Sequence, residues 1–340
     1  MYKINQMKIF DYIYVNVCNK FDQRPILSLF AVTVFLSFFF YSFPSVDRAA
    51  TALFYQPGVG FPAARVEALR DFRNLAANLT VILPVAFSLG LFLKLVYPSK
   101  PCLFSPRMSL YFISLFLIGP ALMVNGVLKS FWGRPRPVNI TEFGGIWPFQ
   151  EAWVIGEHGL LNRSFTSGEA ATIACLLPLA LFVPREWRWQ VATLIGVLVV
   201  ATSLNRIAFG AHFLSDVTIS IGLMLTLAAA LHRLFFVDRA EMLCDAALEA
   251  RLTAYGQRWA ADRAAFRRRS GEVLGAFTRA VGTFLTAQGA AARMVAGRIE
   301  ASIGGEAMVR ALVTPLAAPL SSLTGGRTVR RLSQTTPNRS

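Results

Sequence analysis

Six apolar stretches constrain the fold of this chain more than any other feature of its sequence. A helix needs about 20 mostly apolar residues to cross the ~30 Å hydrocarbon core of a bilayer, and each stretch meets or approaches that length. The composition agrees, because 54% of the 340 residues are hydrophobic and only 16% are charged, against about a quarter in soluble domains. The stretches cover residues 26–43, 75–97, 108–128, 168–183, 187–204 and 213–236. We therefore predict an all-α, polytopic membrane protein built as a six-helix bundle.

The apolar stretches divide the chain into four parts. Residues 1–25 form an N-terminal segment, and residues 26–237 form the six-span domain. Residues 238–303 are expected to be an amphipathic helical extension, whereas residues 304–340 are rich in Gly, Ser, Thr and Pro, a composition typical of disorder. The first span is expected to remain as an anchor, because the segment before it is too long for a signal-peptide n-region and no A-x-A cleavage site follows.

Lys and Arg in the short loops orient the spans, since these residues are enriched on the cytoplasmic side of membranes. They precede the first span, join the second to the third, and join the fourth to the fifth. The residues are Lys3, Lys8, Lys20, Arg24, Lys94, Lys100, Arg107, Arg185 and Arg188. The tail after residue 234 adds fifteen Arg against eight Asp and Glu. Both termini are therefore expected in the cytoplasm.

The net charge of +15, from 34 Lys and Arg against 19 Asp and Glu, does not indicate a nucleic-acid-binding protein. Nucleic acid would require the basic residues to gather on one face, and here they are divided among loops and tail. The four cysteines have no C-x-x-C spacing and the histidines number three. Neither a disulfide framework nor a zinc site is indicated.

The opposite membrane face receives two longer loops, 44–74 and 129–167, and the short link 205–212. Basic residues are disfavoured there. Those of the first loop, Arg48, Arg65, Arg70 and Arg73, are explained by contact with lipid headgroups. Taken alone, Lys129 and Arg134 in the second loop are explained as well by side chains that snorkel from a span end.

A set of polar residues occurs at the ends of four spans on this face. Lys129 ends the third span and is followed by Arg136-Pro137, while Ser167-Gly168-Glu169 opens the fourth. Arg206 ends the fifth span, and His212 opens the sixth with Asp216 four residues later. The set is Lys129, Arg136, Ser167, Gly168, Glu169, Arg206, His212 and Asp216. An anionic ligand is the simplest reason for this collection.

These residue types suit phosphoryl transfer without a metal. Charge spreads over the phosphoryl oxygens in the transition state, so fixed cations such as Lys129, Arg136 and Arg206 would stabilise it. Ser167 and Gly168 begin a helix, where free backbone N–H groups bind anions.

His212 can attack phosphorus to form a phosphohistidine. Asp216 lies one helical turn further on, within reach of the imidazole whose tautomer it would hold.

The three segments resemble the signature of the type 2 phosphatidic acid phosphatase superfamily, membrane relatives of vanadium haloperoxidases. That signature reads K-x6-R-P, then P-S-G-H, then S-R-x5-H-x3-D, and the match covers residues 129–216. The resemblance implies a six-helix membrane bundle and a phosphohistidine on His212 oriented by Asp216, with no metal and no cofactor. It implies that phosphate is held by Lys129, Arg136, Ser167, Gly168 and Arg206.

Three positions depart from the signature. Thr166 replaces Pro and Asn205 replaces Ser, changes expected to alter local turn geometry and one hydrogen bond. Glu169 replaces a His that in the family protonates the leaving oxygen and then activates water. On one reading Glu169 takes over as the acid/base group in a partly dry site. On the other the chemistry is altered or lost, or His158 supplies the proton, although His158 alone reads as an ordinary loop residue.

The glutamate bears on the substrate. A second phosphate beside Glu169 would be repelled, whereas a sugar or glycerol alkoxide is a poor leaving group that gains from an acid. The Ser-Gly-Glu variant, with Gly144-Gly145 after the Arg-Pro pair, is similar to the lipid A 4′-phosphatase subgroup. The favoured function is therefore a lipid phosphatase acting on a phosphomonoester, lipid A 4′-phosphate above all. The site would face the periplasm from a bacterial inner membrane.

Other functions stay open at this point. They are an undecaprenyl diphosphate or phosphatidylglycerol phosphate phosphatase, a lipid phosphotransferase, and a non-catalytic phospholipid binder or transporter. Trp147, Phe149 and Trp153 are expected either to cover a lipid headgroup or to anchor the loop at the interface.

The tail places apolar residues at helical spacing, which predicts a helix on the anionic leaflet or a partner-binding coil. These residues are Leu248, Leu252, Tyr255, Trp259, Leu274, Phe277, Val281 and Phe284.

Overall fold

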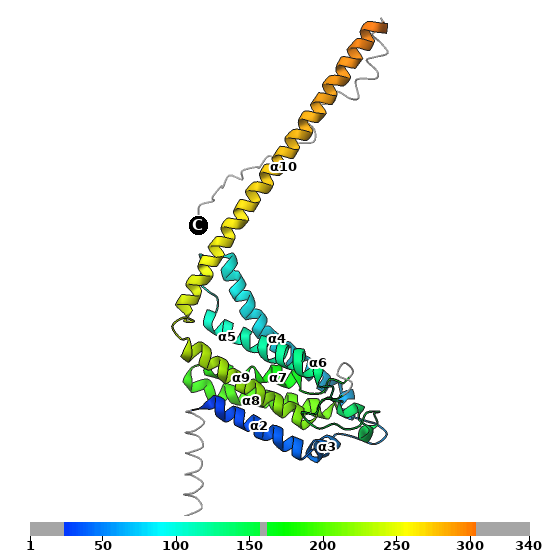
Figure 1. The fold of residues 1–340 in the computed structure, drawn as a ribbon, viewed down its shortest axis with the longest axis vertical. Coiled ribbons are helices and arrows are strands. Elements are labelled where there is room, and N and C mark those ends of the chain that lie inside the picture. Colours follow the sequence, from blue (N-terminus) through cyan, green and yellow to red (C-terminus); the bar gives the residue numbers. More distant parts are fainter. Residues whose placement is uncertain (1–23, 157–161, 304–340) are drawn as a thin grey trace, which may run out of the picture. The chain divides into compact units, whose positions relative to one another are not determined.

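The computed structural model describes residues 24–156 and 162–303. His158, residues 1–23 and the tail 304–340 lie outside this part, so what was expected of them stays a prediction. Within the described residues the regular elements are helices, joined by loops that contain two isolated bridges, Gln56 with Gly60 and Ile140 with Trp147. It divides into two units, Met1–Ala260 and Ala261–Ser340, and the first holds every helix discussed below except the later part of α10 (Figure 1).

Among the residues that the structure describes, five helices are long and apolar enough to cross a membrane, which confirms the all-α, polytopic architecture. Two of them are single α-helices, and three combine an α-helix with a tighter or wider helical segment. They are α2 (Pro25–Ser42), α4 (Glu67–Val96), α5–η2–α6 (Pro106–Phe116, Leu117–Leu128, Lys129–Phe131), η6–α8 (Arg185–Trp187, Arg188–Ala208) and α9–η7 (Leu214–Arg233, Leu234–Asp238).

The remaining expected span, 168–183, is shorter and interrupted. It consists of α7 (Gly168–Ala174) and the 3₁₀ helix η5 (Leu177–Leu181). Pro178 lies in η5, and a proline lacks the N–H that an α-helical hydrogen bond needs. The α7 helix contacts α4, α8, α9 and η2, so it is surrounded by protein. Its buried alanines allow that close approach.

Helix α4 begins at Glu67, well before the apolar run that predicted a span from residue 75. Its first two turns are polar and include Arg70 and Arg73. Glu67 lies in the first turn, where a negative charge interacts favourably with the helix dipole. Arg73 is therefore fixed on a helix, not carried on a loop as the hydropathy pattern suggested.

Helix α9 is the central element of the bundle, and it contacts α2, α5, α7 and η2. Two glycines set these distances. A Cβ on Gly222 would lie 2.5 Å from Thr33 Oγ1 of α2, and a Cβ on Gly119 would lie 2.6 Å from Met224 Sδ of α9. Small residues at such crossings let membrane helices approach closely.

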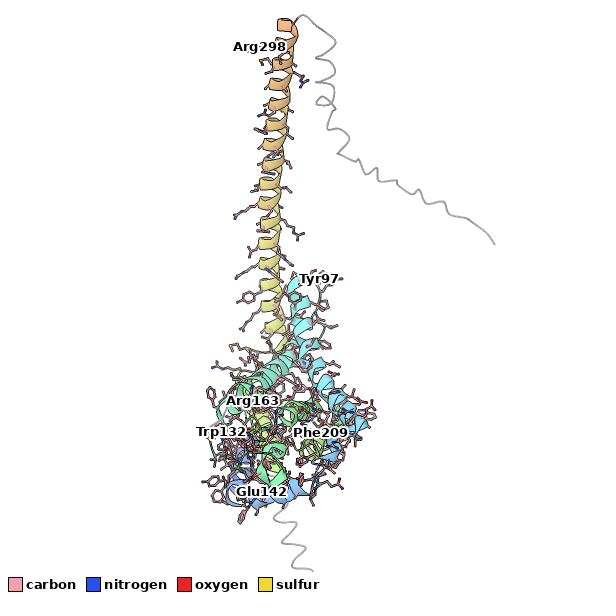
Figure 2. All side chains as sticks on the ribbon, turned by 90° about the vertical axis from the view of Figure 1, so that its right-hand side faces the viewer. Tyr97, Trp132, Glu142, Arg163, Phe209 and Arg298 are labelled. Atoms are coloured by element: carbon pink, nitrogen blue, oxygen red, sulfur yellow. The ribbon has the colours of Figure 1, made fainter. Side chains whose placement is uncertain are left out.

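The loops gather at one end of this unit, together with α3 (Ser45–Ala52) and the first turns of α4, α7 and α9 (Figure 1). Figure 2 places Trp132, Glu142 and Phe209 toward the end away from Tyr97, where α4 ends. These three residues belong to the segments expected on the non-cytoplasmic face.

An aromatic cluster joins these loops. Phe61, Ile140 and Phe143 pack with Phe213, the residue after His212. The Gly144-Gly145 pair closes this loop: Gly144 has φ +84°, and a Cβ on Gly145 would lie 2.0 Å from the Asn139 carbonyl carbon. The glycine pair thus has a packing reason in this chain.

Helix α10 (Asp245–Ile303) begins in the first unit. There Glu249 accepts hydrogen bonds from Lys94 Nζ (3.1 Å) and the Cys102 amide (3.0 Å), and Asp245 accepts one from Ser105 Oγ (2.7 Å). These bonds join the helix to the last turn of α4 and to the loop between α4 and α5. Residues 261–303, in the second unit, are helical and mostly exposed.

Candidate active site

The structure brings the sequence-predicted residues together at the loop end of the bundle. Lys129, Gly168 and Glu169 line a cavity of about 270 Å³, which also contacts Thr202 of α8. The wall formed by α4 is largely apolar. A cavity with a cationic end and an apolar side suits a lipid phosphate in general terms.

His212 precedes α9 and is almost fully buried, with 2% of its surface exposed. Its Nδ1 lies 2.9 Å from the Ser164 carbonyl oxygen and 3.7 Å from Asp216 Oδ2. Because a carbonyl oxygen can only accept, Nδ1–H donates to Ser164. The Asp216 carboxylate lies at the longer distance from the same nitrogen. This arrangement leaves Nε2 with a free electron pair, as a nucleophile requires.

Asp216 holds the two backbone segments on either side of the imidazole. Its carboxylate accepts hydrogen bonds from Ser164 Oγ (2.6 Å), the Phe213 amide (2.9 Å) and Arg134 Nη1 (2.6 Å). The predicted contact between Asp216 and His212 is present as the 3.7 Å approach, and Ser164, which donates Oγ to Asp216 and presents its carbonyl to Nδ1, also links the two side chains.

Arg134 is completely buried and connects three segments. It bridges Asp216 and Asp47, with Nη2 2.8 Å from Asp47 Oδ2. Its Nη1 also donates to Ser215 Oγ (2.8 Å), and its guanidinium lies over the Phe213 ring. Burial opposes its charge, but Asp216 and Asp47 outweigh burial and raise the pKa of Arg134. The snorkelling interpretation of Arg134 is therefore wrong.

Asp47 is also fully buried, although it comes from α3, just after the first span. Its two oxygens accept from the Ser215 amide (2.7 Å) and from Ser215 Oγ (2.5 Å), in addition to Arg134. Burial raises the pKa of Asp47, and Arg134 and Ser215 oppose that rise. Nothing in the local sequence distinguished this aspartate.

Ser167 caps the N-terminus of α7 and fastens it to α9. Its Oγ accepts from the Ala170 amide (3.3 Å), its amide donates to the Asp216 carbonyl (3.2 Å), and its carbonyl accepts from Ser220 Oγ (2.9 Å). A Cβ on the next residue, Gly168, would lie 2.9 Å from Lys129 Nζ. Glycine therefore lets the lysine approach the helix N-terminus.

Glu169 is held by two arginines. Arg73 donates Nη2 to Oε1 (2.8 Å) and shares Nε between Oε1 (3.0 Å) and Oε2 (3.2 Å). Arg206 Nε lies 3.3 Å from Oε2 as an ion pair, but without the geometry of a hydrogen bond. The headgroup interpretation of Arg73 is replaced by this contact.

Two other basic residues of the first loop, Arg48 and Arg65, also have partners within the protein. Arg48 pairs with Glu142 at 3.1 Å, with both side chains substantially exposed, and Arg65 donates to the Val59 carbonyl.

Arg136, in the second loop, is exposed, and it forms no ion pair within residues 24–156 and 162–303. Its positive charge repels that of Lys129.

The aromatic residues of the second loop are part of its packing. Trp153 contacts Phe165 and Trp132, with ring centroids 4.8 and 5.4 Å apart. Phe149 packs edge-on against Phe213 at 5.3 Å. These side chains support the segment that carries Ser164.

Comparison with known proteins gives the family. A family model of the PAP2 superfamily matches residues 110–240. A lipid A 4′-phosphatase of Francisella tularensis subsp. novicida is 32% identical over 196 residues, which are 55% of this chain and 84% of that protein. The chain belongs to the PAP2 superfamily.

Further relatives match over shorter lengths. Lipid A 4′-phosphatases of Rhizobium leguminosarum and Rhizobium etli are each 44% identical over 119 residues, 35% of this chain. The match covers 51% and 46% of those proteins, so the chain spans about half the length of these two relatives. A solved PAP2 type phosphatidylglycerolphosphate phosphatase from Bacillus subtilis is 20% identical, with a TM-score of 0.41, over 62% of this chain and 96% of that one.

The PAP2 match and the site do not have the same extent. The eight sequence-predicted site residues and Arg134 all lie inside residues 110–240. Asp47 and Arg73 lie before it, on α3 and α4. Two side chains that contact the predicted site residues and Arg134 therefore come from outside the family match.

The buried Asp47–Arg134 pair generates a stability prediction. Asp47→Asn leaves a buried guanidinium short of one charge partner, which should lower the free energy of unfolding by about 3 kcal/mol. Thermal unfolding in detergent measures this change. The control is Glu142→Gln, which removes the exposed pair with Arg48 and should change stability by less than about 1 kcal/mol. Equal losses in the two variants would contradict the structural role of Asp47.

The burial of His212 generates a pH prediction. Burial lowers the pKa of His212 to about 4, although Asp216 opposes the shift. The ring should be neutral at pH 6, where a free histidine with a pKa of about 6.5 is mostly charged. Because the unfolded chain takes up this proton first as pH falls, His212 should reduce stability between about pH 6.5 and pH 4.

NMR of ¹⁵N-histidine in a His158→Gln/His232→Gln variant observes this ring alone, since the chain has three histidines. A ring that is charged at pH 6 would refute the prediction.

Proposed function

We propose that this chain is a membrane lipid phosphatase that hydrolyses a phosphomonoester through a phosphohistidine on His212. The observation that carries the proposal is the buried imidazole, whose Nδ1 is occupied by the Ser164 carbonyl. Lys129 and Arg206 lie around the N-terminus of α7 beside it. The similarity to three proteins named lipid A 4′-phosphatase supports the same reading.

In the first step, Nε2 of His212 attacks phosphorus and the bond from phosphorus to the lipid oxygen breaks. The non-bridging oxygens are held by Lys129, Arg136 and Arg206 and by the backbone N–H groups that begin α7. Asp216 stabilises the imidazolium by way of Ser164. The departing oxygen takes up a proton, which we assign to Glu169.

In the second step, water attacks the phosphohistidine, and Glu169 accepts the proton of that water. The bond between phosphorus and nitrogen breaks, inorganic phosphate leaves, and His212 returns to its neutral form. The ionised carboxylate that Arg73 and Arg206 hold is ready for this second role. For the first role Glu169 needs a proton, and a phosphomonoester with a second pKa near 6 can bring one into the site.

Lipid A 4′-phosphate is the substrate we favour. Its phosphate is a monoester on a sugar carbon, and an acid/base glutamate suits that poor leaving group better than a diphosphate. Undecaprenyl diphosphate and phosphatidylglycerol phosphate are the alternative substrates. A phosphotransferase and a non-catalytic lipid binder are the alternative functions.

We also propose that the site faces the periplasm from a bacterial inner membrane, with both termini in the cytoplasm. Trp132 and Phe209, each three positions from Lys129 and His212 respectively, lie away from Tyr97 (Figure 2). Tyr97 is followed by the basic loop that contains Lys100 and Arg107. The positive-inside rule puts that loop in the cytoplasm.

Phosphate release from four purified lipids tests the proposal: lipid A, phosphatidic acid, phosphatidylglycerol phosphate and undecaprenyl diphosphate. Lipid A should be the best substrate, and His212→Ala should lower turnover at least about 10³-fold while the protein stays folded. Radioactive phosphate should be trapped on the wild-type protein and not on the variant. Substantial turnover by His212→Ala would refute the phosphohistidine. Trapped label that passes to a second lipid without phosphate release would indicate a phosphotransferase.

The role of Glu169 has its own test. Glu169→Gln removes the proton donor, so release of a lipid alkoxide should fall at least about tenfold more than release of nitrophenol, which leaves without protonation. Turnover of lipid A and of nitrophenyl phosphate measures the two losses. Equal losses for both substrates would show that Glu169 is not a general acid.

A further inference from the structure

We propose that Arg73 is a positioning residue that keeps the Glu169 carboxylate off Arg206 and so leaves Arg206 free for the phosphoryl group. The inference rests on the proposed function, because it assigns Arg206 to phosphate. It adds a residue from outside the PAP2 match and explains how a glutamate is tolerated in an anion-binding site.

The contacts of Glu169 are unequal. Arg73 makes three hydrogen bonds of 2.8–3.2 Å that reach both oxygens, two of them to Oε1, and such charge-assisted bonds are stronger than neutral ones. Arg206 approaches only one oxygen, at 3.3 Å, and its Nε has no hydrogen-bonded partner among the described residues. The carboxylate is thus oriented by Arg73, and Arg206 has only a longer ion-pair contact with Oε2.

Arg206 is more deeply buried than Arg73. Its side chain is 7% exposed, whereas that of Arg73 is 43% exposed. A buried guanidinium beside a free carboxylate would form a closed bidentate pair, because attraction is stronger where water is excluded. An Arg206 bound in that way would have given two of its five N–H donors and its unpaired charge to the carboxylate, and would bind a phosphate less strongly. The unneutralised carboxylate would also repel the incoming anion.

The need for Arg73 follows from the departures from the family signature. The signature has a histidine at position 169, and a histidine presents no carboxylate for Arg206 to bind. The second departure also meets α4: Asn205, where the signature has Ser, donates Nδ2 to the Leu69 carbonyl at 3.0 Å. Leu69 lies one turn before Arg73. Both substituted residues therefore contact the polar first turns of α4. Glu169 does so through Arg73, and Asn205, the residue before Arg206, does so through the Leu69 carbonyl.

Two other roles for Arg73 make different predictions. If Arg73 only attracted anions through its charge, its loss would weaken phosphate binding whatever residue stood at position 169. If it only held α4 against α7, its loss would lower stability and removal of Glu169 would not repair binding. Only a role that acts through Glu169, by competition for Arg206 together with repulsion of the anion, predicts that a second substitution, at Glu169, restores binding.

The experiment measures binding of inorganic phosphate by the thermal stabilisation that it gives the full chain in detergent. Arg73→Gln should weaken binding about tenfold, the scale of coupling between residues in contact. Glu169→Gln should bind no more weakly than the wild type. The double variant Arg73→Gln/Glu169→Gln should return to the affinity of Glu169→Gln.

Two controls define the signal. Arg206→Gln gives the stabilisation that phosphate produces without the site. Arg70→Gln removes an exposed arginine one turn earlier on α4 and should leave phosphate binding unchanged. If Arg73→Gln does not fold, Arg73→Lys keeps the charge with one donor group and should give a smaller loss that Glu169→Gln again repairs.

The proposal is overturned if Arg73→Gln binds phosphate like the wild type, if the double variant binds as weakly as Arg73→Gln, or if the wild type binds no phosphate. These results do not depend on turnover. Restored phosphate binding in a protein that hydrolyses no lipid would uphold the role of Arg73 and refute the phosphatase. Hydrolysis without restored binding would do the reverse.

Discussion

The buried ion pairs of Arg134 with Asp47 and Asp216 are the interaction on which the site depends. Three segments meet there: α3 after the first span, the loop after α6, and the start of α9. A buried charge that lacks a partner is strongly destabilising, so these segments are stable only when they are assembled together. The same assembly sets Ser164 against Asp216 and thereby fixes the tautomer of His212. The same contacts are therefore required for folding and for the geometry of the proposed nucleophile, His212.

The parts of the molecule that were predicted from sequence are those encoded locally. Five of six expected spans are confirmed as helices of sufficient length, because crossing a bilayer demands a continuous apolar run. The span from residue 168 was predicted as a full helix and is short. Its apolarity serves contact with neighbouring helices, which hydropathy cannot distinguish from contact with lipid. The start of α4 was missed for the opposite reason, since its polar first turns lie beyond the apolar run.

The site divides in the same way. Its motif residues are few positions apart within each segment, and each segment ends or begins a span on one face, so their meeting was predictable. The other contacts join residues that are far apart in the sequence. Asp47 and Arg134 are separated by 87 positions, Arg73 and Glu169 by 96, and Arg134 and Asp216 by 82. No spacing rule links such pairs. Only Arg134 had a local signal, because its Arg-Pro doublet repeats that of Arg136-Pro137.

The two arginine–carboxylate groups, one around Arg134 and one around Glu169, thus differ in burial and in role. The Arg134 group is sealed from water, so neither of its carboxylates can exchange partners without leaving a charge unpaired. The Glu169 group is partly exposed and has one strong and one weak contact, which leaves Arg206 free to move toward an arriving anion. A carboxylate beside a phosphate is compatible with binding only if its charge is already engaged elsewhere. In this chain the α4 extension supplies that engagement, and a glutamate can therefore stand where the family signature has a histidine.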